Sequence, residues 1–412
     1  MSGYYLLGKK LGHSCSPALH ALLGNPDYSL TEIEDESDAE KFIRAGDYRG
    51  LNVTIPYKQL AFSCMDFLSD EARKTGVVNT VCRENGKLSG YNTDCAGLEK
   101  IIQDAGLDLS GKRIVILGEG ATAKTAAYVA QKHGAHSVCF SSRKGQTPLS
   151  LAHTLHGQIL INTTPVGMMP DNGEAPVQLK AFDGLEGVID VVFNPLQTCL
   201  MEQARALGIP CAGGINMLCT QGARSEEIFQ KTRFSPDFVH SVCRKITCMQ
   251  SNLVLCGMPG AGKTTIGRLC ARMLSRPFFD TDEAAEQISG LSPAQLILQR
   301  GEEAFRDIET EAVRLLSMKS GCVIALGGGA VMRQKNRQML LQNGIVCQLQ
   351  RPPALLCTAF RPLSDTPEKM QVLLQLRAPV YESFSHFTVL NDASPEQAAK
   401  KITEAFHAYF GD

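Results

Sequence analysis

Short apolar runs, each followed by a glycine turn and a longer amphipathic stretch, recur along the chain from residue 113 onward. Residues 113–117 form one such run, residues 118–121 are rich in glycine, and an alanine-rich stretch continues to His133. A second apolar run lies at 137–140, so the order predicts a βαβ unit with parallel strands. Further apolar runs at 159–161 and 187–192 are typical of strands buried on both faces.

The last third of the chain repeats this alternation. Residues 236–250 have a helical pattern and lead into an apolar strand at 252–255, and further strands are expected at 322–326 and 345–349. Residues 1–90 mix short apolar runs with polar turns. Both halves are therefore predicted to be α/β with mostly parallel sheets, with a domain boundary near residue 249.

Composition narrows the class of protein without identifying a site. A chain of 412 residues is long enough for about two to three domains. The net charge of −1 gives no electrostatic reason to expect nucleic acid or an anionic membrane surface as a partner. Fifteen cysteines include no C-x-x-C pair and no zinc-ligand spacing, which favours scattered buried thiols in a reducing cytoplasm. No signal-peptide pattern and no apolar stretch of roughly 18 residues is present, so a cytoplasmic protein is expected.

A complete phosphate-binding loop occupies residues 257–264, directly after the strand at 252–255. In this pattern backbone N–H groups surround the phosphates, the lysine reaches the β and γ oxygens, and the threonine hydroxyl ligates Mg²⁺. The nucleotide-binding residues predicted from it are Pro259, Gly260, Ala261, Gly262, Lys263 and Thr264. Because such a loop usually opens its domain, the 250 residues before it need a separate explanation.

A second nucleotide site is indicated at residues 118–123, where G-x-G-x-x-A follows a strand and opens a helix. Gly118, Gly120 and Ala121 allow a tight turn and the close approach of a pyrophosphate. After the next strand the chain carries Ser142, Arg143 and Lys144 rather than an acidic residue. Two cations beside hydroxyls suit a 2′-phosphate, so NADP is favoured over NAD.

Five segments of residues 1–247 resemble shikimate dehydrogenase, in the order found in that family. They are residues 12–17 (GHSCSP), 52–58 (NVTIPYK), 76–80 (GVVNT), 90–94 (GYNTD) and 162–168 (NTTPVGM). The resemblance implies NADPH-dependent reduction of the 3-ketone of 3-dehydroshikimate to shikimate. The chemistry needs a proton donor at the carbonyl oxygen while hydride arrives at carbon, and a lysine beside a carboxylate can supply it.

The same resemblance implies a role for individual residues. Lys58 is the acid/base and Asp94 its partner, while Gly214 belongs to the cofactor site. Ser14 and Ser16 are expected to hold the substrate carboxylate. The hydroxyls of the substrate are expected to bind Thr54, Asn79 and Gln221.

Residues from about 252 to 410 resemble shikimate kinase, through the phosphate loop and through the segments FFDTD (278–282), GEEAFRDIE (301–309) and LGGGA (326–330). The implied reaction is phosphoryl transfer from ATP to the 3-hydroxyl of shikimate. Thr264 and Asp280 are expected to hold Mg²⁺, and Asp282 to orient the attacking hydroxyl. Lys263 and the lid residue Arg361 neutralise the transferring phosphates. The substrate is expected to contact Arg306, Gly328, Gly329 and Arg377.

Together the two resemblances predict an order of domains. Residues 1–95, completed by about 220–248, form an α/β substrate domain, and residues 96–219 form a Rossmann NADP domain. Residues 250–412 form a P-loop kinase domain with a central parallel sheet. Three features depart from the families: Phe193 stands where tyrosine is usual, the segment after Lys144 is short, and so is the lid around Arg361.

Other functions were weighed against this bifunctional enzyme. Modules of this kind can act as regulators that sense ligands without turnover, but that interpretation predicts loss of Lys58, Asp94, Lys263 or Asp282, and all four are present. A quinate- or NAD-preferring dehydrogenase fused to a generic NTPase is disfavoured by Arg143 and Lys144. Direct transfer of shikimate between the sites has no support in the sequence, and co-expression is the favoured explanation of the fusion.

Overall fold

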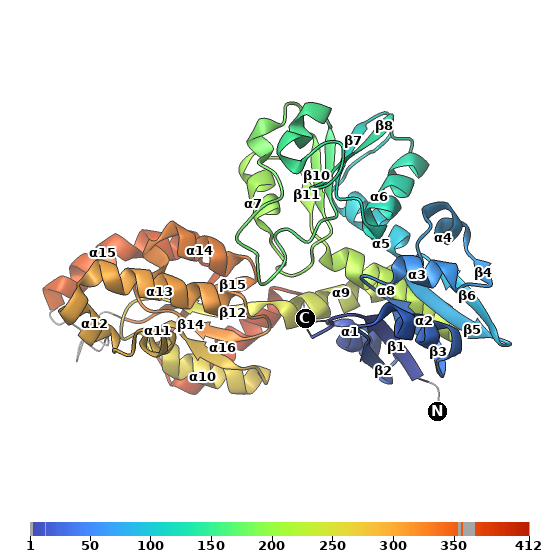
Figure 1. The fold of residues 1–412 in the computed structure, drawn as a ribbon. Coiled ribbons are helices and arrows are strands. Elements are labelled where there is room, and N and C mark those ends of the chain that lie inside the picture. Colours follow the sequence, from blue (N-terminus) through green and yellow to red (C-terminus); the bar gives the residue numbers. More distant parts are fainter. Residues whose placement is uncertain (1–2, 13, 353–355, 357–366, 412) are drawn as a thin grey trace. The chain divides into compact units, whose positions relative to one another are not determined.

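The computed structural model describes residues 3–12, 14–352, 356 and 367–411. The chain divides into two compact units, Met1–Ile246 and Thr247–Asp412 (Figure 1). Each unit is α/β, as the apolar pattern predicts, and each is described by itself.

The first unit begins with a six-stranded mixed sheet of order β2-β1-β3-β5-β6-β4. Strands β2, β1 and β3 pair in parallel, whereas β5 pairs antiparallel with both β3 and β6. The parallel pattern expected for the whole chain therefore gives way here to a hairpin at Asn85-Gly86, where both residues have a positive φ. The strands are β1 Gly3–Gly8, β2 Tyr28–Glu32, β3 Tyr48–Val53, β4 Phe67–Leu68, β5 Thr80–Glu84 and β6 Lys87–Tyr91, and the helices are α1 Ser16–Leu22, α2 Glu36–Ala45, α3 Lys58–Ser63 and α4 Asp70–Thr75.

A second, fully parallel sheet of order β11-β10-β9-β7-β8 follows in the same unit. Its central strands are buried on both faces, which explains their continuous apolar runs. The predicted strand at 187–192 ends early, because the Asp190 carboxylate accepts a hydrogen bond from the backbone N–H of Val192 and turns the chain. The elements are α5 Asp94–Asp104, β7 Arg113–Leu117, α6 Ala121–Lys132, β8 Ser137–Ser141, β9 Ile159–Asn162, β10 Gly187–Asp190, α7 Cys199–Ala206 and β11 Cys211–Ala212, with 3₁₀ turns at Leu149–Leu155 and Leu179–Ala181.

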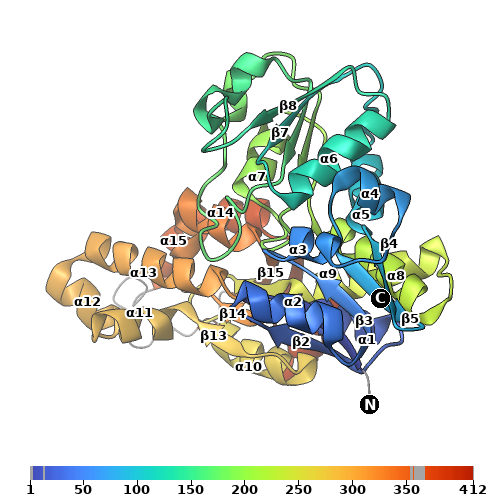
Figure 2. The same cartoon turned by 45° about the vertical axis from the view of Figure 1, so that its right-hand side comes forward.

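Helix α8 (Ile215–Gln230) returns the chain from the second sheet to the first. It packs against α5 and α1 and against strands β3 and β5 (Figure 2). The contact with α5 is close because Gly97 has no side chain, and a Cβ there would lie 2.6 Å from the carbonyl oxygen of Met217. Helix α9 (Pro236–Gln250) then leads to the second unit.

The second unit is built on a parallel five-stranded sheet of order β13-β14-β12-β15-β16. The phosphate loop follows its central strand, as the sequence predicts. The strands are β12 Asn252–Cys256, β13 Phe278–Asp280, β14 Val323–Ala325, β15 Gly344–Gln350 and β16 Phe387–Leu390. The helices are α10 Lys263–Leu274, α11 Thr281–Ser289, α12 Pro293–Arg300, α13 Glu302–Ser317, α14 Gln334–Leu341, α15 Pro367–Phe384 and α16 Pro395–Ala408, with a 3₁₀ turn at Ala330–Met332.

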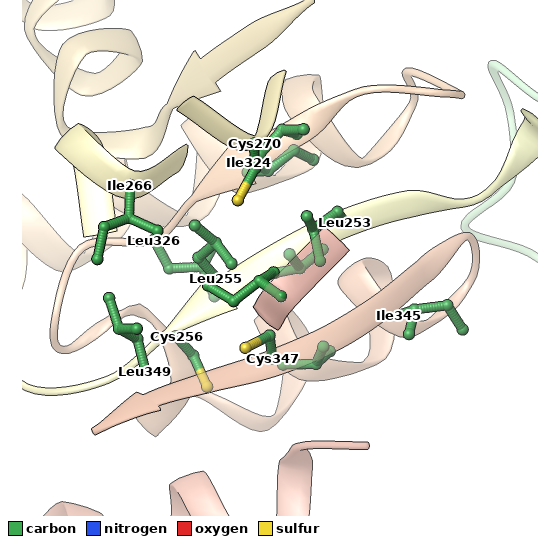
Figure 3. Close-up of a cluster of buried hydrophobic side chains, with 14 of the residues drawn as sticks. Leu253, Leu255, Cys256, Ile266, Cys270, Ile324, Leu326, Ile345, Cys347 and Leu349 are labelled. Atoms are coloured by element: carbon green, nitrogen blue, oxygen red, sulfur yellow. The ribbon is translucent and has the colours of Figure 1, made fainter. Parts of the chain in front are cut away.

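The core of this second unit lies around β12 and β15, where Leu253, Leu255 and Leu349 are buried (Figure 3). Burying each such side chain stabilises the fold by roughly 1.5–3 kcal/mol. Thiols of Cys256 and Cys347 fill the same core, and burial raises the pKa of Cys256 to about 12. Eleven of the fourteen described cysteines are buried, so these thiols act as small apolar groups.

Among the residues described, no helix combines the length and apolar character that crossing a membrane would require.

Candidate active sites

A buried ion pair joins the two residues predicted to carry the reduction. Lys58 opens α3 directly after the loop that follows β3, and Asp94 opens α5 after β6. Lys58 Nζ lies 2.5 Å from Asp94 Oδ2, and the two side chains are only 12% and 6% exposed. A buried carboxylate needs such a partner, and here the partner is a group that can also give up a proton.

Asn79, just before β5, fixes the other side of this carboxylate. Its Nδ2 donates to Asp94 Oδ1 at 2.9 Å and lies 3.4 Å from Gln221 Oε1 on α8. Its Oδ1 accepts from the backbone N–H of Thr93 at 2.8 Å. Four of the predicted residues, Lys58, Asp94, Asn79 and Gln221, are therefore together in one buried polar group.

Ser14, Ser16 and Thr54 lie in segments that follow the carboxyl ends of β1 and β3. Ser14 Oγ donates to Ser16 Oγ at 3.1 Å and accepts from the backbone N–H of Ser16 at 3.3 Å. Within the described part of the chain, the serine side chains bond to each other and to none of the other predicted substrate residues. Thr54 follows β3 directly, and its N–H donates to the Leu7 carbonyl at 2.9 Å.

The predicted dinucleotide turn lies between β7 and α6, which begins at Ala121. Gly118 has φ +108°, and a Cβ there would lie 2.7 Å from Thr163 Oγ1, so the turn requires glycine. Gly120 precedes the helix, and Gly214 precedes α8 with its N–H donating to the Val192 carbonyl at 3.0 Å.

The loop after β8 has side chains that favour the binding of a phosphate, but a carboxylate that opposes it lies nearby. Arg143 and Lys144 are exposed, and Ser142 is buried, with no hydrogen-bond partner for its Oγ among the described residues. The carboxylate of Glu119 lies against the same loop, since a Cβ added to Gly145 would be 2.1 Å from Glu119 Oε1 and 2.7 Å from Ser142 Oγ. The sequence motifs did not single out Glu119.

In the second unit, Lys263 opens α10 and folds back over the phosphate loop. Its Nζ donates to the carbonyl oxygens of Gly257 and Met258 at 2.9 and 3.0 Å, and the residue is buried. The loop ends at Gly262, and the N–H groups in the first turn of α10 have no acceptor within the helix, which makes this helix N-terminus suited to an anion. Pro259, Gly260 and Ala261 complete the loop.

Thr264 and the two aspartates of the β13–α11 junction form the adjoining polar cluster. Thr264 Oγ1 donates to Asp280 Oδ2 at 2.7 Å, while Asp280 Oδ1 caps α11 by accepting from the N–H of Asp282 at 2.9 Å. A hydroxyl and a carboxylate are the hard oxygen ligands that Mg²⁺ prefers, and Mg²⁺ commonly takes only one or two protein ligands. The residues present therefore fit this ion.

The glycines at 327–329 lie against charged side chains. A Cβ on Gly329 would lie 2.3 Å from Arg306 Nη1, and one on Gly327 would lie 2.5 Å from Asp282 Oδ1 and 2.7 Å from Glu309 Oε1. Asp282, Arg306 and Gly329 thus converge. Gly328 accepts a hydrogen bond from Tyr381, whose pKa is raised by burial, and the buried Arg377 on α15 opposes that rise.

Glu309 is the main residue of this cluster that sequence reasoning missed. It is 1% exposed, and its Oε2 accepts from Arg306 Nη1 at 2.7 Å. Burial raises the pKa of Glu309, and Arg306 opposes that rise. The i,i+3 spacing of the two residues on a helix could have indicated the pair. The predicted lid residue Arg361 lies outside the described residues.

These features define the class of protein. The first unit has the geometry of a dinucleotide-dependent oxidoreductase with a lysine–carboxylate acid/base pair, and the second that of a small-molecule kinase with a phosphate loop.

Comparisons with known proteins identify both units. The family model described as "Shikimate dehydrogenase substrate binding domain" matches residues 6–81, and that of "Shikimate kinase" matches residues 259–407. A shikimate dehydrogenase (NADP⁺) of Clostridium beijerinckii is 35% identical over 250 residues, which cover 56% of this chain and 93% of that protein.

Solved structures agree with this assignment. A chorismate mutase/shikimate 5-dehydrogenase fusion protein from Clostridium acetobutylicum is 29% identical with a TM-score of 0.56, covering 60% of this chain and 97% of that one. Shikimate 5-dehydrogenase from Thermus thermophilus, solved in complex with NADP(H) and shikimate, is 29% identical with a TM-score of 0.51, covering 60% and 99%. The chain belongs to the shikimate dehydrogenase family and carries a shikimate kinase domain behind it, which makes it a bifunctional enzyme of the shikimate pathway.

Proposed function

We propose that the chain reduces 3-dehydroshikimate to shikimate with NADPH through Lys58 and Asp94, and phosphorylates the shikimate 3-hydroxyl with ATP through Lys263 and Asp282. The observation that carries the proposal is the buried Lys58–Asp94 pair, in a chain that also holds a complete phosphate loop next to two aspartates. The two reactions are consecutive, because the hydroxyl made by the first is the nucleophile of the second.

In the first reaction, NADPH supplies hydride to the carbonyl carbon when it is bound. Lys58 donates a proton to the carbonyl oxygen, which otherwise would become an alkoxide. Asp94 pairs with the Lys58 side chain at 2.5 Å and orients it toward the substrate, and Asn79 holds Asp94 in place through the 2.9 Å bond to Oδ1. Lys58 is reprotonated from solvent after the alcohol forms.

The remaining predicted residues bind and orient the two ligands. Ser14 and Ser16 hold the substrate carboxylate, whereas Thr54, Asn79 and Gln221 hold its hydroxyls. The cofactor pyrophosphate is held at the turn of Gly118, Gly120 and Ala121, and Gly214 also contacts the cofactor. The 2′-phosphate is held by Ser142, Arg143 and Lys144; the unpartnered Ser142 hydroxyl supports this role.

In the second reaction, ATP supplies the phosphoryl group, and Lys263 with the loop N–H groups neutralises its charge. Thr264 and Asp280 would hold Mg²⁺, which would help to neutralise the charge of the phosphates. Asp282 orients the 3-hydroxyl and accepts its proton. Arg306, Gly328, Gly329 and Arg377 bind the substrate, with the Arg306 fork on its carboxylate. Arg361, which is not among the described residues, neutralises charge on the phosphates in this proposal.

The proposal also assigns a role to each domain. Residues 1–95, completed by about 220–248, form the substrate domain; the packing of α8 on α1, β3 and β5 supports this. Residues 96–219 form the NADP domain and 250–412 the kinase domain. The fourteen described cysteines are thiols rather than disulfides, which supports a cytoplasmic location.

The reductase assignment is tested with Asp94→Asn and Lys58→Ala. We expect kcat for NADPH oxidation to fall by about 10²–10⁴-fold in both, with the KM for NADPH unchanged, because the general acid and its partner act on the substrate oxygen. Retention of full kcat in Lys58→Ala would exclude the lysine as the acid.

The metal assignment is tested in the kinase reaction. Thr264→Val and Asp280→Asn remove one oxygen ligand or one charge each, so both should raise the Mg²⁺ concentration needed for half-maximal phosphorylation. A Mg²⁺ dependence identical to that of the unchanged protein would contradict the site.

A further inference from the structure

A buried histidine–glutamate pair connects α1 with α8 in the first unit. Glu226 of α8 is fully buried, and its Oε1 lies 2.5 Å from Nδ1 of the equally buried His20 on α1. Asn25 donates to the same oxygen at 2.8 Å, and Gln230 donates to Oε2 at 2.5 Å. A carboxylate in this position is costly unless all its lone pairs are satisfied, and here each oxygen has a partner.

The pair belongs to a series of contacts that starts at His20 and returns to α8 next to Glu226. The His20 ring stacks on Tyr28 with centroids 3.6 Å apart and planes 6° apart. Tyr28 donates to Asn52 Oδ1 at 2.8 Å, and Asn52 Nδ2 donates to Ser225 Oγ at 2.9 Å. Ser225 precedes Glu226 on α8, so the contacts return to their origin. We call these five residues the His20–Glu226 ring.

The ring touches the proposed catalytic group through Ser225. The Ser225 hydroxyl lies 2.9 Å from Thr80 Oγ1 and 3.2 Å from Thr93 Oγ1, and Thr93 bonds to Asn79. Asn52 also donates to the Asn79 carbonyl at 3.2 Å. Asn79 in turn holds Asp94, so the position of the carboxylate depends on the ring.

The ring also spaces the elements that carry the substrate ligands. Ser16 lies one turn before His20 on α1, and Gln221 lies one turn before Ser225 on α8. Strand β3 carries Asn52 two residues before Thr54. Helix α1, helix α8 and strand β3 lie in the same part of the first unit (Figure 1). The buried polar contacts of the ring connect them to one another.

We propose that His20 and Glu226 are positioning residues of the dehydrogenase, which set the spacing between the carboxylate end and the hydroxyl end of the substrate site. Neither residue touches the reacting atoms. The inference rests on the proposed roles of Ser16, Gln221 and Asp94. It predicts that a substitution in the ring lowers the affinity for 3-dehydroshikimate. The affinity for NADPH should not change, because the dinucleotide turn lies elsewhere, between β7 and α6.

The test uses Glu226→Gln in the full chain, with Glu227→Gln as the matched control. Glu227 is the next residue on α8, but it bonds to Arg224, Arg233 and the N–H of Phe234, away from the ring. For Glu226→Gln we expect the KM for 3-dehydroshikimate to rise on the order of tenfold, with the KM for NADPH within about twofold of normal. For Glu227→Gln both KM values should remain unchanged.

A second variant covers the case in which Glu226→Gln fails to fold. Ser225→Ala removes one hydroxyl from the ring, and we expect it to lower kcat/KM for 3-dehydroshikimate while NADPH binding is retained. Unchanged kinetics in Ser225→Ala, or equal KM changes for both ligands in Glu226→Gln, would overturn the inference. Activity surviving in Lys58→Ala would instead overturn the proposed site on which it rests.

Discussion

At the scale of single residues, Glu119 marks where the dehydrogenase departs from an ideal NADP site. Its carboxylate lies close to Ser142. Ser142 belongs to the loop after β8, which also carries Arg143 and Lys144. A negative charge there repels a 2′-phosphate, and because the residue is exposed the effect is about 0.5–1 kcal/mol. Glu119→Gln should therefore lower the KM for NADPH by about two- to fivefold and leave the KM for NADH unchanged. A KM for NADPH that rises would show that Glu119 assists binding instead.

Arg306, proposed to bind the substrate carboxylate of the kinase, also forms ion pairs within its own unit. It bonds to Glu302 and to the buried Glu309, so removing its charge leaves a carboxylate buried without a partner. Arg306→Met should lower the free energy of unfolding of the kinase unit by about 3 kcal/mol or more. Arg306→Lys should keep most of that stability but raise the KM for shikimate, because a single ammonium cannot form the fork. Denaturation curves and kinase kinetics on the two variants separate the effects; equal stability loss in both would contradict this account.

At the scale of elements, Asp190 ties the end of β10 to its neighbours and makes the dehydrogenase unit sensitive to pH. Burial raises the pKa of Asp190 from 3.8 to about 6, against hydrogen bonds from Thr198, Val192 and Asn162 that lower it. Between pH 3.8 and about 6 the native state holds a proton that the unfolded chain releases. Stability from this group therefore falls as pH rises through that window, by on the order of 2–3 kcal/mol.

Asp190→Asn removes this titration. Comparing the thermal unfolding of the two proteins from about pH 4 to about pH 7, we expect the stability difference to shift in favour of the variant as pH rises, and to be constant above about pH 7. A difference that is the same at every pH would show that Asp190 does not hold the extra proton.

The elements also show what the sequence could and could not predict. Strands such as β7, β9 and β12 are continuous apolar runs next to glycine turns, and local pattern suffices to find them. The antiparallel β5–β6 hairpin has a local signal in its Asn85-Gly86 turn that the apolar pattern did not use. The return of α8 to the first sheet depends on contacts between distant segments, and only the family resemblance predicted it. His20 and Glu226 are 206 residues apart, and no periodicity connects them. Motif residues of both sites could be named in advance, and the i,i+3 spacing from Arg306 could have indicated Glu309. The buried partner Ser225, in contrast, is defined only by packing.

At the scale of the whole molecule, the chain unites two enzymes whose reactions follow each other. Within the described residues the two units have separate sheets, and each has its own predicted nucleotide-binding turn. We therefore expect shikimate to pass through solution. In the coupled reaction from 3-dehydroshikimate to shikimate 3-phosphate, the lag should equal that of separately prepared units at the same concentration. A markedly shorter lag would indicate direct transfer.

The most direct test of the central claim measures both activities in two single variants of the full chain. Lys58→Ala should lose NADPH oxidation with 3-dehydroshikimate and retain ATP consumption with shikimate. Lys263→Ala should show the reverse, because each lysine serves only its own site. Loss of both activities in either variant, or retention of both, would contradict two independent active sites on one chain.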